Sequence, residues 1–246
     1  MSLIRILSLS LFAFAVGCAT ADQVKQLEER VVQLEESAKN APAGKKSSKR
    51  DEKAEKAGAE LLDGVNKAIA AGDITAAKAK LAQLKAKYAS TGAYKRARRY
   101  EAELAVVGKD APASLEIEKW LANKANLDLA SESPTLLVFW EEWCPHCKRE
   151  VPKMQKLHDD FKGQGLQMVG LTKVTRSSTE DKVNAFIKDN KLSYPMAKEV
   201  VKDGKGNLST HFSVRGVPAA AVVKGGKIVW RGHPGRLNDA MIKSWL

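Results

Sequence analysis

The sequence predicts an α/β C-terminal domain with a mixed sheet flanked by helices, preceded by a short coiled-coil stalk and a small all-α helical module. Apolar runs of strand length alternate with helical patterns in the C-terminal half, which favours a parallel crossover. A glycine-bearing turn between two short apolar runs near the end indicates an antiparallel hairpin. Because the composition also shifts sharply near residues 59 and 110, we expect a modular protein.

The first residues have the anatomy of a signal peptide, which we place at residues 1–17. Arg5 precedes an uncharged stretch from Ile6 to Val16 that is too short to span a bilayer. The mature protein is therefore expected to be exported.

Ala15-Val16-Gly17-Cys18 resembles the lipobox of bacterial lipoproteins, although Leu is more usual where Ala15 stands. The resemblance implies that Cys18 is lipidated and holds the protein on the periplasmic side of the bacterial envelope. By analogy with the lipoprotein sorting rules of enteric bacteria, in which aspartate after the lipidated cysteine retains a protein at the inner membrane, Ala19 favours the outer membrane. The alternative is an ordinary signal peptide followed by a stray thiol.

Residues 18–38 are expected to hold the lipid anchor and a short coiled coil. Apolar residues recur there at the alternating three- and four-residue spacing of a coiled-coil seam, namely at Val24, Leu27, Val31 and Leu34. Isolated helices of this length are marginal in water, so a homo-oligomer through residues 24–34 and a lone amphipathic stalk stay open as alternatives. Residues 39–58 contain no large apolar residue and are predicted to be a disordered basic linker.

Residues 59–108 are predicted to form a module of three helices, separated at Gly72-Asp73 and at Ser90-Thr91-Gly92. Their apolar stripes are Leu61, Leu62, Val65 and Ile69; Ile74, Leu81, Leu84 and Tyr88; and Tyr94, Tyr100, Leu104 and Val107. Nothing in this module carries chemistry. It is therefore either a platform for a client or partner, or a spacer that lifts the C-terminal domain off the membrane.

The tetrapeptide Cys144-Pro145-His146-Cys147 follows the apolar run Leu136–Trp140 and indicates a redox-active dithiol. A strand that gives way to a helix places Cys144 at the helix N-terminus, where free N–H groups favour a thiolate. Cys144 is thus the predicted nucleophile. Cys147, three residues on and on the same helical face, is predicted to attack the mixed disulfide that Cys144 forms with a client.

The alternative interpretation of this tetrapeptide is half of a zinc site with His146 as the third ligand. No second Cys-x-x-Cys and no His-x3-5-His pair follows at ligand spacing, so we predict no metal site. Disulfide exchange needs no cofactor.

Three further motifs lie around this tetrapeptide. They are Val107-Gly108-Lys109-Asp110-Ala111-Pro112; Phe139-Trp140-Glu141-Glu142-Trp143-Cys144 with Cys147-Lys148-Arg149-Glu150-Val151-Pro152; and Arg215-Gly216-Val217-Pro218. Together they resemble the TlpA/ResA-like branch of thioredoxin-fold thiol-disulfide oxidoreductases. The resemblance implies a thioredoxin-like domain over residues 109–246 that acts on cysteine-containing exported proteins, with a membrane redox partner. The Pro-x3-Thr-x2-Cys signature of the peroxiredoxins, which share the fold, is missing.

The residues predict the same architecture. The expected strands are Leu136–Trp140 and Leu166–Leu171, then Ala219–Val223 and Lys227–Trp230 around the turn Lys224-Gly225-Gly226. The expected helices are Cys144–Phe161, Thr179–Asn190 and Leu237–Trp245.

The resemblance also assigns roles to residues outside the tetrapeptide. It implies that Pro218 is a cis-proline facing the dithiol, so that the backbone of Val217 can pair with an extended client and Trp143 can contact it. The alternative is a trans-proline that opens a strand. Glu150 matches a glutamate that could relay a proton to the departing thiol, or it is an ordinary solvated charge on the helix.

Two departures from the family bear on the chemistry. Thioredoxin carries a buried aspartate where this chain has Val138, so proton transfer is left to Glu150 or water. Pro145 and His146 stand in the order found in DsbA-like oxidases, and a histidine N–H beside Cys144 would make the disulfide more oxidising. The direction, reductase or oxidase, stays open.

The formal net charge is +12, which we interpret as mostly solvated surface. We expect no nucleic-acid partner, because an exported protein would have to meet nucleic acid outside the cytoplasm. The alternative function is an envelope binding or scaffold lipoprotein whose redox-gated thioredoxin-like domain is a holdase or a metal carrier. The scattered positions of Met154, Met168 and Met196 instead suggest core filling.

Overall fold

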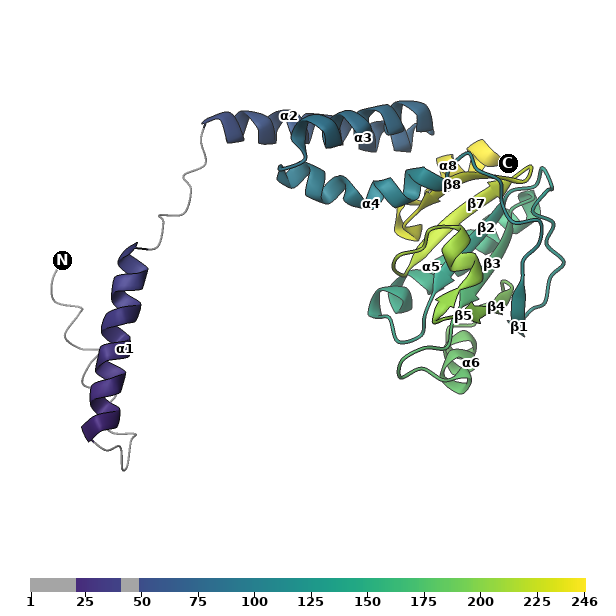
Figure 1. Cartoon of the computed structure of the whole chain (residues 1–246). Helices are drawn as coiled ribbons and strands as arrows, with labels where there is room; N and C mark the ends of the chain where they lie inside the picture. Colours follow the sequence, from purple (N-terminus) through teal and green to yellow (C-terminus); the bar gives the residue numbers. More distant parts are fainter. Residues whose placement is uncertain (1–20, 41–48) are drawn as a thin grey trace. The chain divides into compact units, whose positions relative to one another are not determined.

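The structure is a computed structural model that describes residues 21–40 and 49–246 (Figure 1). The predicted signal peptide and Cys18 lie outside the described residues. The chain divides into two compact units, Met1–Lys49 and Arg50–Leu246. Within the described ranges, none of the helices combines the length and the apolar character that crossing a membrane requires.

The described part of the first unit is one helix, α1 (Ala21–Asn40). It covers the predicted seam at residues 24–34, so the helix itself is confirmed. Val31 and Val32 are exposed, at 53% and 54%. Association with a second copy through this seam stays a prediction.

The second unit begins with three helices, as predicted: α2 (Lys49–Ala70), α3 (Ile74–Tyr88) and α4 (Gly92–Val106). Asp73 and Thr91 cap α3 and α4, because their side chains accept hydrogen bonds from the backbone N–H groups of Ala76 and Tyr94. Val65, Leu84 and Tyr100 are at most 2% exposed at the centre of the helical core. The helices are therefore held together by apolar packing, which supplies most of the stability of short helices.

The prediction of a disordered linker over residues 39–58 is wrong at both ends, because residues 39–40 belong to α1 and residues 49–58 form the start of α2. Lys, Glu and Ala have high helix propensity, and here they continue into a segment that packs against α3 and α4. Glu55 adds a tertiary contact, because its carboxylate accepts a hydrogen bond of 2.8 Å from the N–H of Gly92 at the start of α4. Residues 49–58 are therefore helical although they contain no large apolar side chain.

The rest of the second unit is built on a six-stranded mixed sheet with strand order β1-β4-β3-β2-β7-β8 (Figure 1). Its strands are β1 (Ile117–Ala122), β2 (Thr135–Trp140), β3 (Gln167–Thr172), β4 (Met196–Glu199), β7 (Ala219–Lys224) and β8 (Lys227–Gly232). A separate two-stranded sheet consists of β5 (Val201–Lys202) and β6 (Lys205–Gly206). The remaining elements are helices α5 (Pro145–Phe161), α6 (Glu180–Asp189), α7 (Asn207–His211) and α8 (Asp239–Trp245), and 3-10 turns at Lys162–Gln164 and Pro234–Arg236.

Strand β2 is the centre of the sheet. It pairs in parallel with β3 and antiparallel with β7, and β7 pairs antiparallel with β8. The predicted crossover and hairpin are both confirmed. Gly225 and Gly226 make the hairpin turn with φ values of 55° and 71°, which favour glycine.

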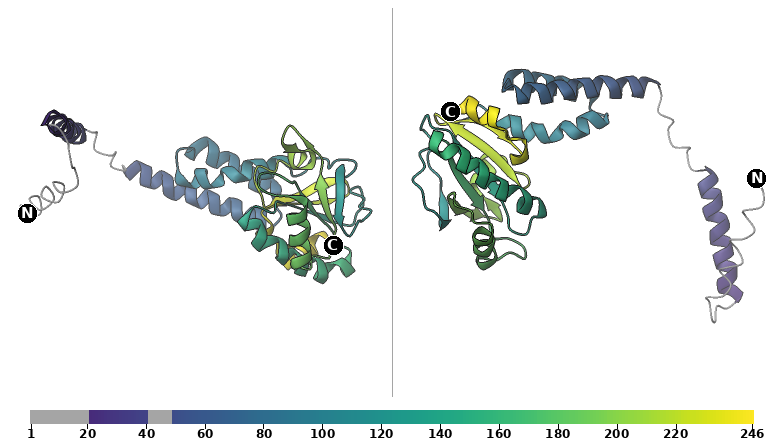
Figure 2. Two further views of the ribbon diagram at one scale, coloured as in Figure 1. Left: turned by 90° about the horizontal axis from the view of Figure 1, so that it is seen from below. Right: turned by 180° about the vertical axis from the view of Figure 1, so that it is seen from behind.

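The sheet has a separate apolar core on each face. Successive side chains of a strand point to opposite faces, so Leu136, Val138 and Trp140 enter one core while Leu137 and Phe139 enter the other. Helices α5, α6 and α8 cover the first core and α7 contributes to the second. The right-hand view of Figure 2 shows α5 lying across the face of the sheet. The α/β fold class with a mixed sheet flanked by helices is thereby confirmed.

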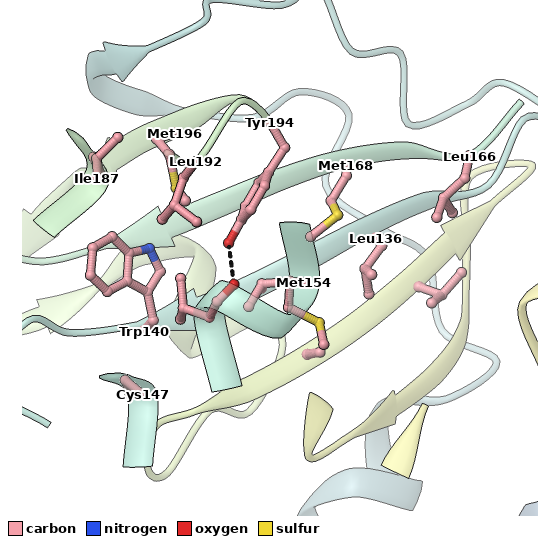
Figure 3. Close-up of a cluster of buried hydrophobic side chains, with 14 of the residues drawn as sticks. Leu136, Trp140, Cys147, Met154, Leu166, Met168, Ile187, Leu192, Tyr194 and Met196 are labelled. Carbon is pink, nitrogen blue, oxygen red and sulfur yellow. Dashed lines mark hydrogen bonds between the residues drawn. The ribbon is translucent and has the colours of Figure 1, made fainter. Parts of the chain in front are cut away.

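Cys147, the more buried cysteine of the dithiol, is part of the first core. Figure 3 shows Cys147 beside Trp140 at one end of this core. The hydroxyl of the buried Tyr194 donates a hydrogen bond of 3.2 Å to the carbonyl oxygen of Val151, which ties α5 to the segment before β4. The position of α5, and so of the dithiol, is fixed by this packing.

The helical module contacts the sheet domain within the second unit. The guanidinium of Arg236, in the turn after β8, forms an ion pair of 2.6 Å with Glu103 of α4. The backbone N–H of Gly108, just after α4, donates a hydrogen bond of 2.8 Å to the carbonyl oxygen of Ile228 in β8. Helix α4 thus lies against the side of the sheet where β8 forms the edge (Figure 1).

Candidate active site

Cys144 caps the N-terminus of α5, directly after the strand β2 and a short turn. Its Sγ accepts a hydrogen bond from the backbone N–H of Cys147 at 3.4 Å and donates one to the carbonyl oxygen of Val217 at 3.5 Å. Both cysteines are free thiols. A sulfur at the helix N-terminus is stabilised as a thiolate by the unpaired N–H groups of the first turn.

The two cysteines differ in accessibility. Cys144 is 4% exposed, whereas Cys147 is fully buried. Burial raises the pKa of the Cys147 thiol, and its hydrogen bond with Cys144 and the negative charges of Cys144 and Glu141 raise it further. Cys147 is therefore held as a thiol at neutral pH, and Cys144 is the sulfur that an incoming disulfide can reach.

The loop before β7 faces this dithiol. The Val217–Pro218 peptide bond is cis, in agreement with the resemblance. Pro218 is buried and Val217 is half-buried. The backbone of Val217 is thereby placed beside the reacting sulfur, where an extended polypeptide could pair with it.

Pro145 and His146 are exposed on the first turn of α5. The Nδ1 atom of His146 lies 2.5 Å from the guanidinium of Arg149, which must be the donor because arginine has no acceptor. Among the hydrogen bonds of the described residues none joins His146 to Cys144, so an effect of His146 on the Cys144 thiolate stays a prediction.

Glu150 lies one turn beyond the dithiol and its side chain is only 14% exposed. One carboxylate oxygen pairs with Lys153 at 2.9 Å, whereas Oε2 is buried without a hydrogen-bond partner among the described residues. This oxygen faces the turn at Gly235, next to His233. Burial lowers the pKa of His233, and the charge of Glu150 acts in the opposite direction. Glu150 is thus a partly desolvated carboxylate and not an ordinary surface charge.

A second carboxylate, Glu141, was given no role by the sequence. It is 5% exposed, accepts a hydrogen bond of 2.7 Å from Nε1 of Trp143 and one from the hydroxyl of Thr175, and lies 3.3 Å from the ammonium of Lys173. The guanidinium of Arg176 stacks 4.1 Å from the centre of the Trp143 ring. This network fixes the tryptophan that precedes Cys144.

The network forms at the carboxyl ends of two neighbouring parallel strands, because Glu141 follows β2 and Lys173 follows β3. Two consecutive acidic residues, Glu141 and Glu142, directly after a fully apolar strand were the signal that could have revealed it. Glu142 makes the more exposed pair, 2.7 Å from Lys148, and that pairing lowers its pKa.

The methionines considered as metal ligands are core residues. Met154, Met168 and Met196 are at most 5% exposed and all pack in the first core (Figure 3). In the part of the chain that the structure describes, no group of three or more His, Cys, Asp or Glu side chains is arranged to hold a metal ion.

Comparison with known proteins gives a consistent set of matches. The model of the AhpC/TSA family matches residues 107–231, just over half of the 246-residue chain. Sporulation thiol-disulfide oxidoreductase A of Bacillus subtilis (strain 168) is 29% identical over 111 residues, which are 45% of this chain and 65% of that protein. The thiol:disulfide interchange protein DsbE of Yersinia pestis is 31% identical over 140 residues, 56% of this chain and 69% of that protein.

Among solved structures, the crystal structure of StoA from Bacillus subtilis is similar over 55% of this chain and 98% of its own. It is 25% identical, with a TM-score of 0.42. The chain thus matches 65% of the length of the Bacillus subtilis sporulation oxidoreductase, which is less than two thirds. It matches nearly all of the solved StoA chain.

Proposed function

Because the chain belongs to the AhpC/TSA family and has the thioredoxin fold, we propose that it is a thiol-disulfide oxidoreductase of cysteine-containing exported proteins. The observation that carries the proposal is the position of Cys144. It caps a helix, is more accessible than Cys147, and contacts the loop at Val217. The absence of the peroxiredoxin signature Pro-x3-Thr-x2-Cys favours disulfide exchange over peroxide reduction.

The reaction proceeds through a mixed disulfide. The Cys144 thiolate attacks one sulfur of a client disulfide, and the other client sulfur leaves as a thiolate and takes up a proton. Cys147 then loses its proton and attacks Sγ of Cys144, which releases the second client thiolate. The client gains two electrons and the enzyme is left with a Cys144–Cys147 disulfide. A membrane redox partner that donates thiol electrons restores the dithiol, and the reverse sequence oxidises a client.

The second step needs a base, because the pKa of Cys147 is raised by its burial. Glu150 is suited to this role because it lies one helical turn from Cys147 and its Oε2 atom is buried without a hydrogen-bond partner among the described residues. Val217 offers its backbone to an extended client, and Trp143 provides an apolar surface next to Cys144. The direction of exchange in the cell depends on the redox partner.

The proposal places the enzyme on the periplasmic side of the bacterial envelope, held by a lipid on Cys18. The support is the sequence Ala15-Val16-Gly17-Cys18 after an apolar stretch. Mass spectrometry of the mature N-terminus tests this point. An unmodified Cys18, or cleavage elsewhere, would contradict lipid anchoring without affecting the chemistry of Cys144.

An insulin-reduction assay on the full chain in detergent, with dithiothreitol as the electron donor, tests the enzymatic function. We expect the wild type to accelerate precipitation of the insulin chains and Cys144→Ser to abolish the acceleration. A matched variant, Met154→Leu, changes a sulfur-containing core residue and should retain it. A wild type no faster than Cys144→Ser would favour the alternative, an envelope binding protein with a redox-gated domain.

A further inference from the structure

A cavity of about 440 Å³ lies in the second unit between α4, the loop before β7 and the end of β8. Its walls are rich in guanidinium groups, which come from Arg98, Arg99, Arg215, Arg231 and Arg236. Glu103 is the one carboxylate among the lining residues. The site is therefore strongly positive, and its size is within the range of pockets that hold small ligands or peptide side chains.

The most buried of these cations has no carboxylate partner in the described structure. Arg231 is 7% exposed and donates hydrogen bonds to the carbonyl oxygens of Phe212 and Gly232, both at 3.1 Å, and of Ser213 at 3.4 Å. Carbonyl groups orient a guanidinium but do not neutralise it. The charge of Glu103 acts on Arg231 without a direct ion pair, and Glu103 pairs with Arg236 instead. The cavity therefore keeps an excess of positive charge, which favours an incoming anion.

The single carboxylate is already engaged. Glu103 pairs with Arg236 at 2.6 Å, and the Nε atom of Arg236 is buried without a partner among the described residues. In the described part of the chain, Arg99 donates a single side-chain hydrogen bond, to the hydroxyl of Tyr100 at 2.9 Å, and stacks on its ring. The described residues give Arg98 and Arg215 no ion pair. Several fork-shaped donors thus remain for an anion of planar shape, such as a carboxylate.

The cavity adjoins the place where a client would react. Gly216 and Pro218 line it, while the carbonyl oxygen of Val217 between them accepts a hydrogen bond from Cys144. His233 lines it as well, and the charge of Glu150 acts on that ring. A polypeptide that passes along Val217 with its cysteine at Cys144 would bring its neighbouring side chains to the arginines.

We propose that this cavity is a specificity site for carboxylate side chains, which selects client segments carrying Asp or Glu close to the reacting cysteine. The inference rests on the proposed function and deepens it, because it names the chemistry of the preferred client. Bidentate arginine–carboxylate pairs in a concave, partly desolvated site supply both attraction and orientation. The occupant is a polypeptide segment, since the cavity is lined by the two residues that flank the client-facing Val217.

The test is the rate at which the full chain, reduced, reacts with two matched peptide disulfides. One peptide carries two Glu residues beside its cysteine, and the other has Gln at the same positions. We expect the acidic peptide to react about tenfold faster at low ionic strength, and the advantage to shrink as salt screens the arginines. The variant Arg98→Gln/Arg215→Gln should lose most of this advantage.

The matched control is Lys95→Gln/Arg96→Gln, which removes the same charge from exposed positions of α4 that do not line the cavity. It should keep the preference of the wild type. Equal rates for both peptides with the wild type, or an equal loss in both double variants, would overturn the inference while leaving the oxidoreductase function in place. A wild type that reacts with neither peptide would overturn the proposed function and this inference together.

Oxidised glutathione provides a third arm, because it brings carboxylates close to a disulfide without a polypeptide. We expect Arg98→Gln/Arg215→Gln to affect the acidic peptide more than oxidised glutathione, since only the peptide extends along the loop. A loss confined to oxidised glutathione would overturn the assignment to a polypeptide client.

Discussion

The Sγ atom of Cys144 lies 3.5 Å from the carbonyl oxygen of Val217, although 73 residues separate them in the sequence. The sheet creates this contact, because Cys144 follows the central strand β2 and Val217 precedes its antiparallel neighbour β7. The same pairing that buries the core therefore places the nucleophile beside the backbone proposed to bind the client. Stability and function depend here on one set of strand contacts.

This geometry predicts different behaviour for the two cysteines. Cys147→Ser should accumulate mixed disulfides with clients through Cys144, since the thiol that resolves them is absent. Cys144→Ser should trap nothing comparable, because the remaining Cys147 is fully buried. Non-reducing gels of proteins recovered with each variant measure the adducts. Equal adducts from both variants would contradict the assigned order of attack.

A second prediction concerns the reduction potential. We expect the Cys144–Cys147 disulfide to be more oxidising than that of thioredoxin, about −270 mV, because the helix N-terminus stabilises the Cys144 thiolate. The contact between His146 and Arg149 holds a guanidinium near this first turn. His146→Pro removes the acceptor for Arg149, so the potential should fall by about 30 mV, a tenfold change in the equilibrium constant.

Equilibration with glutathione buffers measures these potentials. Arg149→Gln is the matched variant and should lower the potential in the same direction if the effect passes through its charge. A wild type at or below the potential of thioredoxin would refute the argument and favour the reductase role common in the TlpA/ResA-like branch.

The central part of the fold was predictable because its strands are buried on both faces. Leu136–Trp140 and Ala219–Val223 are continuous apolar runs, and both are strands within one residue of the predicted bounds. The edge strand β1 (Ile117–Ala122) was not predicted, because Glu118 and Lys119 face solvent and interrupt any apolar pattern. Strand β4 has four residues, too few for periodicity to show.

The sequence predicted those parts of the candidate active site whose residues are close together along the chain. Cys144 and Cys147 are three residues apart and are recognised from spacing alone. The pair of Glu141 with Lys173, in contrast, exists because β2 and β3 are neighbours in the sheet. The arginine cavity likewise combines α4 with residues more than one hundred positions later, so composition reveals the charge but not where it gathers.

The buried pair predicts a large effect for a third variant. Glu141→Gln leaves the ammonium of Lys173, 16% exposed, without its carboxylate, which should cost about 3 kcal/mol of the free energy of unfolding. It also removes a negative charge that contributes to the raised pKa of Cys147, so this pKa should fall. Chemical denaturation measures the first effect, and the pH dependence of the ultraviolet absorbance of the Cys147 thiolate in Cys144→Ser measures the second.

The neighbouring Glu142→Gln is the matched control for this prediction. Glu142 pairs with the half-exposed Lys148, and such pairs contribute less than about 1 kcal/mol. Equal losses of stability for the two variants would show that burial of the Glu141–Lys173 pair is not what stabilises this part of the fold.

The last prediction concerns the pH dependence of stability and rests on Glu199. This carboxyl is 1% exposed, and burial raises its pKa above the ordinary value of 4.5, although hydrogen bonds from the N–H and hydroxyl of Ser209 and the charge of Lys173 act in the opposite direction. The charge of Glu141 adds to the increase. The folded protein therefore holds this proton more tightly than the unfolded chain does.

A carboxyl whose folded-state pKa is raised stabilises the fold below its unfolded pKa, and that contribution is lost as pH rises through the folded-state pKa. Wild type should thus lose stability relative to Glu199→Gln as pH increases from 4.5, until the folded-state pKa has been passed. Glu180→Gln is the opposite control, because Lys119 and Lys198 lower the pKa of Glu180, and wild type should gain on that variant as pH rises towards 4.5. Thermal unfolding of the three proteins between about pH 2.5 and pH 8 measures both slopes. A pH-independent difference between wild type and Glu199→Gln would show that Glu199 titrates alike in the folded and unfolded states.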